Sequence, residues 1–167
     1  RNVCKAVDPP QTDETEMYVL SEAEVDSLLQ AAKGDRYYPL YVTALYTGMR
    51  RGELLGLRWQ DVDIDEGIAW VRQTLERAGL NPVFGTPKNR KARPVPLVPE
   101  VIEALRALRV EQEIERSHYA QDYRDYDLVF AQPDGGPISP SSFNRWSWQP
   151  IRKRAGLPKQ VRFHDLG

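Results

Sequence analysis

Three arginines and three glycines share one short apolar segment, residues 46–59 (YTGMRRGELLGLRW). A helix that serves packing alone avoids glycine, because each interior glycine costs about 1 kcal/mol relative to alanine. A guanidinium presents its donors in a planar fork that fits two phosphate oxygens. The segment therefore suggests a backbone, opened by its glycines, that approaches a phosphate closely. The alternative is a packed helix in which Arg50 pairs with Glu53, and the segment by itself favours neither reading.

Basic residues also gather in two other places, although the net charge of the chain is only −1. Residues 88–93 and residues 150–162 carry several lysines and arginines each and no acidic residue. Charge that is segregated in this way can build a cationic face on a nearly neutral protein, as a phosphate-backbone partner requires. For either cluster alone, an ordinary solvated surface is the simpler explanation.

The overall composition places limits on the class of protein. A chain of 167 residues with 41% hydrophobic and 28% charged residues is typical of one soluble globular core. No apolar run approaches the roughly 18 residues of a membrane helix, and a single cysteine excludes an internal disulfide. We therefore expect a cytoplasmic protein. The two histidines, His118 and His164, lack the spacing of metal ligands, so we predict no metal site and no cofactor.

The apolar pattern that must position these residues predicts a mainly helical α+β domain. Ser21 and Glu24 form a capping box for a helix that ends at residues 33–34. A second helix is expected from Asp35 into the arginine-rich segment. Two more follow, a long one from Pro99 and a later one that ends near residues 155–156.

Between these helices the sequence period changes to that of strands. Residues 67–71, 82–87 and 93–97 are expected to form a three-stranded antiparallel meander, in which the basic turn 88–91 joins the last two strands. The prolines in these segments indicate a small, irregular sheet. Residues 128–130 are predicted to form one further short buried strand.

Three motifs then follow one another in a fixed order: residues 47–53 (TGMRRGE), residues 86–88 (TPK) opening a basic hairpin that ends at residues 95–97 (VPL), and residues 163–166 (FHDL). Together they resemble the catalytic domain of the tyrosine recombinases, in particular the phage-integrase branch. The resemblance covers nearly the whole chain from residue 20 onward. It implies site-specific DNA recombination or integration by phosphoryl transfer through a phosphotyrosine intermediate. The implied partners are double-stranded DNA sites and other recombinase protomers, in a tetramer of the intact protein, with no membrane and no small-molecule substrate.

The resemblance also implies roles for single residues. Arg50 matches the first catalytic arginine, which contacts the scissile phosphate, and Lys88 matches the hairpin lysine that protonates the departing 5′-oxygen. His164 matches a histidine that supports the phosphate, while Glu53 and Asp165 match acidic positions that orient these groups. The residue types suit the task, because arginine stays charged and lysine can release its proton. From the basic clusters we predict DNA contacts by Arg90, Lys91, Arg93, Arg152, Lys153 and Arg154, and we regard Arg51 and Arg58 as surface or DNA-facing charges.

The chain also departs from the family pattern. Gly167 stands where the family has a second arginine, and none of the eight tyrosines sits where the family places its nucleophile. We therefore expect residues 19–167 to be a partial catalytic domain that is inactive alone, and residues 1–18 to be a linker from a missing N-terminal DNA-binding domain. The alternatives are a degenerate, non-catalytic remnant that binds DNA or a partner recombinase, and an unrelated helical interaction domain.

Overall fold

The computed structural model describes residues 18–87 and 92–166. In chain order the elements are α1 (Glu22–Ala32), α2 (Tyr38–Thr47), α3 (Arg51–Gly56), the 3-10 helix η2 (Trp59–Asp61), β1 (Val62–Asp63), β2 (Ile68–Val71), β3 (Thr74–Arg77), β4 (Val83–Gly85), β5 (Arg93–Pro96), α4 (Pro99–Tyr119), the 3-10 helix η3 (Ala120–Asp122), α5 (Pro140–Phe143), the π-helix η4 (Asn144–Trp148), α6 (Gln149–Arg154) and the 3-10 helix η5 (Phe163–Leu166). The predicted mainly helical α+β class is confirmed.

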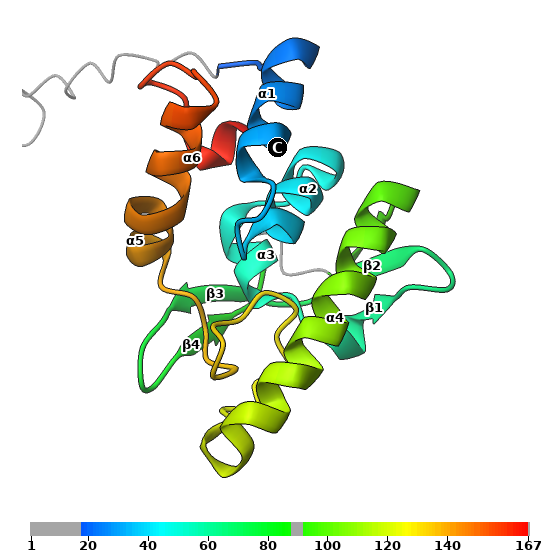
Figure 1. Ribbon diagram of the computed structural model, residues 1–167. Helices are drawn as coiled ribbons and strands as arrows, with labels where there is room; N and C mark the ends of the chain where they lie inside the picture. Colours follow the sequence, from blue (N-terminus) through cyan, green and yellow to red (C-terminus); the bar gives the residue numbers. More distant parts are fainter. Residues whose placement is uncertain (1–17, 88–91, 167) are drawn as a thin grey trace, which may run out of the picture.

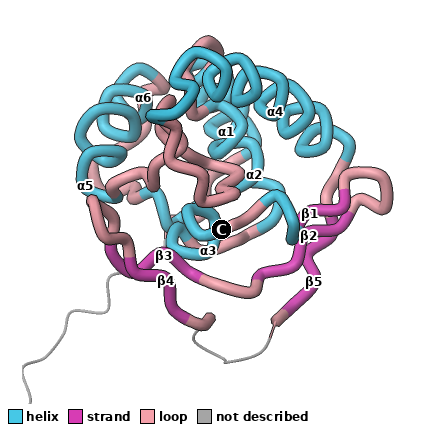
Figure 2. The backbone as a smooth tube through the Cα atoms, turned by 90° about the horizontal axis from the view of Figure 1, so that it is seen from below, coloured by secondary structure: helices cyan, strands magenta, loops and turns pink. Residues whose placement is uncertain are grey.

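The helices and the strands occupy different sides of the molecule. In Figure 2 the strands lie along the lower edge and the longer helices lie above them. Figure 1 shows α3 between the β3–β4 pair and the sheet that contains β1 and β2. The short helix that begins beside Arg50 is therefore in a position to contact both sheets.

The first helix follows its sequence signals. Ser21 and Glu24 form the predicted capping box, with the Ser21 backbone N–H donating to the Glu24 carboxylate at 2.8 Å. The second predicted helix is wrong in one respect, because it does not continue through the arginines. Gly48 adopts a left-handed conformation with φ of 61° and closes α2, and α3 starts afresh at Arg51.

The three-stranded antiparallel sheet exists, but the prediction that residues 82–87 belong to it is wrong. Its order is β1-β2-β5, with Ala69 opposite Val95, whereas β4 pairs with β3 in a separate two-stranded sheet. Strand β3 was missed because it holds one buried apolar residue, Leu75, among polar neighbours. Residues 128–130 form no strand, and Leu128 makes only an isolated bridge to Arg58.

An aromatic cluster joins the C-terminal part of the described chain to α2. The ring of Phe163 packs edge-on against Tyr41, Phe143 and Trp148, with centroid distances of 5.9, 5.0 and 5.7 Å. Interlocked aromatic rings bury a large apolar area and fix relative orientation. The short helix η5, which carries His164 and Asp165, is therefore anchored to the central helix of the domain.

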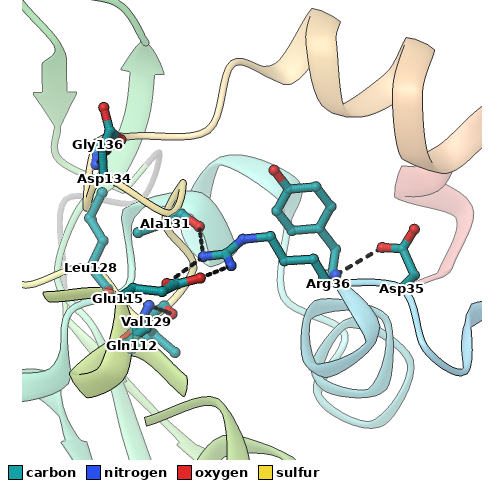
Figure 3. Close-up of polar contacts among 10 residues, drawn as sticks. Asp35, Arg36, Gln112, Glu115, Leu128, Val129, Ala131, Asp134 and Gly136 are labelled. Carbon is teal, nitrogen blue, oxygen red and sulfur yellow. Dashed lines mark hydrogen bonds and ion pairs between the residues drawn. The ribbon is translucent and has the colours of Figure 1, made fainter. Parts of the chain in front are cut away.

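Polar contacts hold the long helix α4 in place, as Figure 3 shows. The guanidinium of Arg36 donates to Glu115 on α4 and, from Nη2, to the carbonyl of Ala131 at 3.2 Å. The amide of Gln112 donates to the carbonyl of Val129 at 2.8 Å. These bonds join α4 to the α1–α2 connection and to the loop before α5. No helix within the described ranges has the length and apolar character needed to cross a bilayer.

Candidate functional site

Arg50 lies directly before α3, with its backbone fixed and its side chain largely free. The Arg50 backbone N–H donates to Oε2 of Glu53 at 3.0 Å, and the Arg50 guanidinium lies 3.4 Å from Oε1 of the same carboxylate. The side chain of Arg50 is 66% exposed, whereas that of Glu53 is 2% exposed. A buried carboxylate thus sets the position of the arginine while leaving the guanidinium accessible.

A second arginine reaches the same carboxylate from the sheet. Nη2 of Arg93, the first residue of β5, donates to Oε2 of Glu53 at 2.7 Å. Arg93 was predicted to contact DNA, but its charge faces Glu53. The structure therefore joins Arg50, Glu53 and Arg93 into one group, which we call the Glu53 cluster.

The Glu53 cluster borders a hollow of about 310 Å³ between α3, β3 and the end of β4. Its lining residues are Arg50, Gly52, Glu53, Thr74, Glu76 and Thr86. Thr86 precedes Pro87, the last described residue before the basic segment. Lys88, Arg90 and Lys91 lie outside the described residues, so their predicted roles remain predictions.

One glycine of the arginine-rich segment, Gly56, serves packing within the protein, which corrects the sequence interpretation for that position. A Cβ on Gly56 would lie 2.8 Å from the backbone nitrogen of Leu75, and one on Gly52 would lie 3.4 Å from the carbonyl oxygen of Leu75. Both positions face β3. Gly56 lets the strand approach α3 closely, whereas Gly52 has room for a side chain and lines the same hollow as Arg50.

His164 and Asp165 form a second group with Arg162 on η5 and just before it. The Asp165 side chain is 1% exposed and accepts from the Arg162 backbone N–H at 2.7 Å and from Nη2 of Arg162 at 3.1 Å. Burial raises the pKa of the Asp165 carboxyl, but the Arg162 hydrogen bonds outweigh it and the pKa lies below its ordinary value. His164 is 58% exposed, with Nε2 3.4 Å from Oδ1 of Asp165.

One local pattern, not recognised in the sequence, recurs in these groups. A buried acidic residue follows an arginine by three positions in Arg50–Glu53, Arg58–Asp61 and Arg162–Asp165, and each pair forms an ion pair. Arg162 therefore joins the candidate site as the partner of Asp165. The spacing Arg-x-x-acid was the available signal, because residues three apart on a helical turn face one another.

The second basic cluster divides into inner and outer residues. Arg152 is buried, and its guanidinium donates to the carbonyl of Leu157 at 3.0 Å and to Oε1 of Gln149 at 3.1 Å. This position does not suit the predicted DNA contact of Arg152, because the side chain is buried and each guanidinium nitrogen already donates inside the protein. Lys153 and Arg154 are exposed on α6. Among the described residues no cluster of three metal-ligating side chains occurs.

Comparison with known proteins identifies relatives of this site and fold. A XerC-like tyrosine recombinase of Caldanaerobacter subterraneus is 31% identical over 172 residues, which cover 95% of this chain and 43% of the relative. The crystal structure of XerA recombinase matches with a TM-score of 0.68 and 30% identity, over 95% of this chain and 49% of that one. The Tn1549 transposon integrase, solved in complex with transposon right end DNA, shares the fold with a TM-score of 0.77 and 21% identity, over 93% of this chain and 52% of that one.

The chain spans less than half the length of the XerC-like relative, so the match concerns one region of that protein. Within this chain, the phage integrase family model matches residues 18–166, which include Arg50, Glu53, His164 and Asp165. The chain therefore belongs to the phage integrase family, in the catalytic-domain region of the tyrosine recombinases.

Proposed function

We propose that this chain supplies the phosphate-binding part of a DNA recombinase active site. The observation that carries the proposal is the state of Arg50, whose backbone is fixed by a buried carboxylate while its guanidinium stays 66% exposed at a hollow. Arginine in such a position can donate two hydrogen bonds to the non-bridging oxygens of a phosphodiester. Donors held in place before the reaction stabilise the charge that develops in its transition state.

In the proposed reaction a tyrosine hydroxyl gives its proton to water as its oxygen attacks the phosphorus, and the bond from phosphorus to the 5′-oxygen breaks. Arg50 binds the non-bridging oxygens, and His164 supports the phosphate. Lys88 gives a proton to the departing 5′-oxygen, and the DNA strand stays attached to the protein as a phosphotyrosine. Attack by the freed 5′-hydroxyl of another strand reverses these steps and rejoins the DNA.

Four of the described tyrosines do not suit the role of nucleophile. Tyr41 is buried and shares a hydrogen bond of 2.7 Å with Ser147, and burial raises the pKa of its hydroxyl. The Tyr18 hydroxyl donates a hydrogen bond to Glu24, and this bond raises the pKa of the Tyr18 hydroxyl as well. Tyr38 and Tyr46 line a hollow between α2 and α4 that does not include Arg50. We propose that the nucleophile belongs to another part of the intact protein and that residues 1–167 alone do not cleave DNA.

The proposed partners are double-stranded recombination sites and further recombinase protomers. The Tn1549 integrase, which shares this fold, was solved bound to transposon end DNA. Lys153 and Arg154 on α6, together with Arg90 and Lys91, are proposed to contact the phosphate backbone. Such contacts release counterions, so DNA binding should weaken steeply as the salt concentration rises.

A nicked suicide substrate tests this function, because the nick lets the cleaved strand diffuse away and traps a covalent intermediate. The intact protein should form a protein–DNA adduct on its own recombination site, and residues 1–167 should form none. An adduct from residues 1–167 would refute the proposed division of the active site. Salt-sensitive DNA binding by the intact protein without any adduct would favour a non-catalytic DNA-binding protein.

A further inference from the structure

We propose that Arg93 is a positioning residue for the reaction, which acts on Arg50 through Glu53. The inference rests on the proposed function and adds to it a residue that the sequence pointed to as a DNA contact. By neutralising Glu53, Arg93 keeps the Arg50 guanidinium available for the phosphate.

Two arginines balance the charge of the buried Glu53 carboxylate, and they do so unequally. The carboxylate is 2% exposed, and a buried carboxylate requires close positive or hydrogen-bond partners. Its shortest contact to a guanidinium is the 2.7 Å bond from Arg93, whereas the Arg50 guanidinium lies 3.4 Å away. Arg93 is therefore the main countercharge, and Arg50 is held mainly by its backbone N–H.

The described residues on either side of the segment that contains Lys88 both lie close to α3. Thr86, before this segment, lines the same hollow as Arg50, and Arg93, after it, binds Glu53. Arg93 is also fixed in register, because it opens β5 opposite Val71 of β2. The bond from Arg93 to Glu53 thus connects the far end of the Lys88 segment to the start of α3.

Positioning of Arg50 by Arg93 can be distinguished by measurement from a direct contact between Arg93 and a DNA phosphate. A positioning residue changes the rate of cleavage and leaves the electrostatics of DNA binding unchanged. An arginine that binds a DNA phosphate contributes about 0.9 to the slope of log affinity against log salt concentration. The Arg93 side chain is 42% exposed, so only such a measurement distinguishes the two roles.

The test uses the intact protein with Arg93→Gln, Glu53→Gln and the double variant. We expect Arg93→Gln to slow single-turnover adduct formation by about 10- to 100-fold, as misplacement of a catalytic group does. The salt slope of DNA binding should stay unchanged. Adding Arg93→Gln to Glu53→Gln should slow cleavage by less than about 3-fold more, because Arg93 then has no carboxylate through which to act.

Arg106→Gln is the matched control, since it removes an arginine whose surface pair with Asp65 spans 3.6 Å and is exposed. It should leave the cleavage rate unchanged. Arg93→Lys keeps the positive charge and should restore part of the rate, and it serves as the test variant if Arg93→Gln fails to fold. Its effect should likewise disappear in the Glu53→Gln background.

Two results would overturn the inference while leaving the proposed function intact. The first is an active wild-type protein in which the Arg93 and Glu53 effects multiply independently. The second is an Arg93 variant that lowers the salt slope of DNA binding by about 0.9, which would make Arg93 a phosphate contact. Lack of any adduct from the wild-type protein would instead refute the proposed function, and the inference with it.

Discussion

Two buried carboxylates on the same stretch of chain, Glu53 and Asp61, each bind a pair of arginines. Asp61 accepts from Nε of Arg58 at 2.7 Å and lies 3.0 Å from Nε of Arg72, so each of its oxygens has its own arginine. Glu53 instead receives Arg93 and the Arg50 backbone on a single oxygen, and the Arg50 guanidinium is left 66% exposed.

The difference shows what separates a reactive group from a structural one here. The Arg58 side chain is only 27% exposed and its guanidinium is bound to Asp61, while the Arg58 backbone forms a bridge to Leu128, so this arginine serves the fold. Both groups satisfy the rule that buried charges are paired. Both acids have two arginines, and what marks the Glu53 cluster is that the exposed Arg50 guanidinium borders a hollow and Arg50 is held through its backbone.

The largest expected effect comes from removing the exposed Arg50 guanidinium. Arg50→Ala in the intact protein should slow adduct formation by about 10²- to 10³-fold, because a positioned donor to the developing charge is lost. Arg58→Ala should change the rate by less than about 5-fold at equal DNA occupancy, since its guanidinium is bound to Asp61. Single-turnover kinetics on the suicide substrate measures both. Equal losses would remove the distinction between the two groups.

Neutralising the two carboxylates should affect stability alike and activity differently. Glu53→Gln and Asp61→Asn each leave two arginines without their shared acid, and each should lower the free energy of unfolding by about 2 to 3 kcal/mol. The value stays below that of a fully buried pair because the arginines are partly exposed. Urea denaturation measures the stability, and adduct formation should fall only for Glu53→Gln. A comparable fall for Asp61→Asn would contradict the assignment.

A smaller effect is expected from a change in the packing of α3 against β3. Gly56→Ala would place a Cβ 2.8 Å from a backbone nitrogen of β3, and backbone atoms there have little room to shift. We expect a loss of about 1 to 2 kcal/mol in the free energy of unfolding. Gly52→Ala is the control, because the nearest atom lies at 3.4 Å and alanine favours the helix. Thermal denaturation of both variants checks the difference. A Gly56→Ala variant that is as stable as Gly52→Ala would show that α3 and β3 are not tightly packed at Gly56.

The smallest effect concerns the third pair, Arg162–Asp165, and depends on pH. The pKa of Asp165 in the folded protein lies below its ordinary value of 3.8, because hydrogen bonds from Arg162 outweigh the effect of burial. The pair therefore contributes its stability above pH 3.8 and loses it as the pH falls through the lower folded value. Acid denaturation of the wild type and Asp165→Asn should give stability curves that converge below this pH. Parallel curves would show that Asp165 is not held ionised by the fold.

Local signals in the sequence predicted the elements that depend on neighbouring residues. The capping box at Ser21 fixed the start of α1, and the order of the three motifs identified the family and Arg50. The break at Gly48 was missed because a glycine within an apolar helical pattern signals either a tolerated defect or a helix end.

Contacts between distant segments could not be predicted in this way. Arg93 and Glu53 are 40 residues apart in sequence, and a basic cluster gives no sign that one of its members turns inward. Arg152 was misread for a different reason, since its partners Leu157 and Gln149 are near in sequence but a run of basic residues does not show which of them turns inward. Strand β3 went unrecognised because its partner strand and α3, rather than its own residues, define it.

The most direct test of the phosphate site removes the charge from the DNA instead of the protein. A methylphosphonate at the scissile position replaces one charged non-bridging oxygen with a methyl group, so a guanidinium has less charge to neutralise. We expect the roughly 10²- to 10³-fold penalty of Arg50→Ala on ordinary DNA to shrink to less than about 10-fold on this substrate. The small effect of Arg58→Ala should be the same on both. An Arg50→Ala penalty of equal size on the charged and the neutral substrate would contradict the claim that Arg50 binds the scissile phosphate.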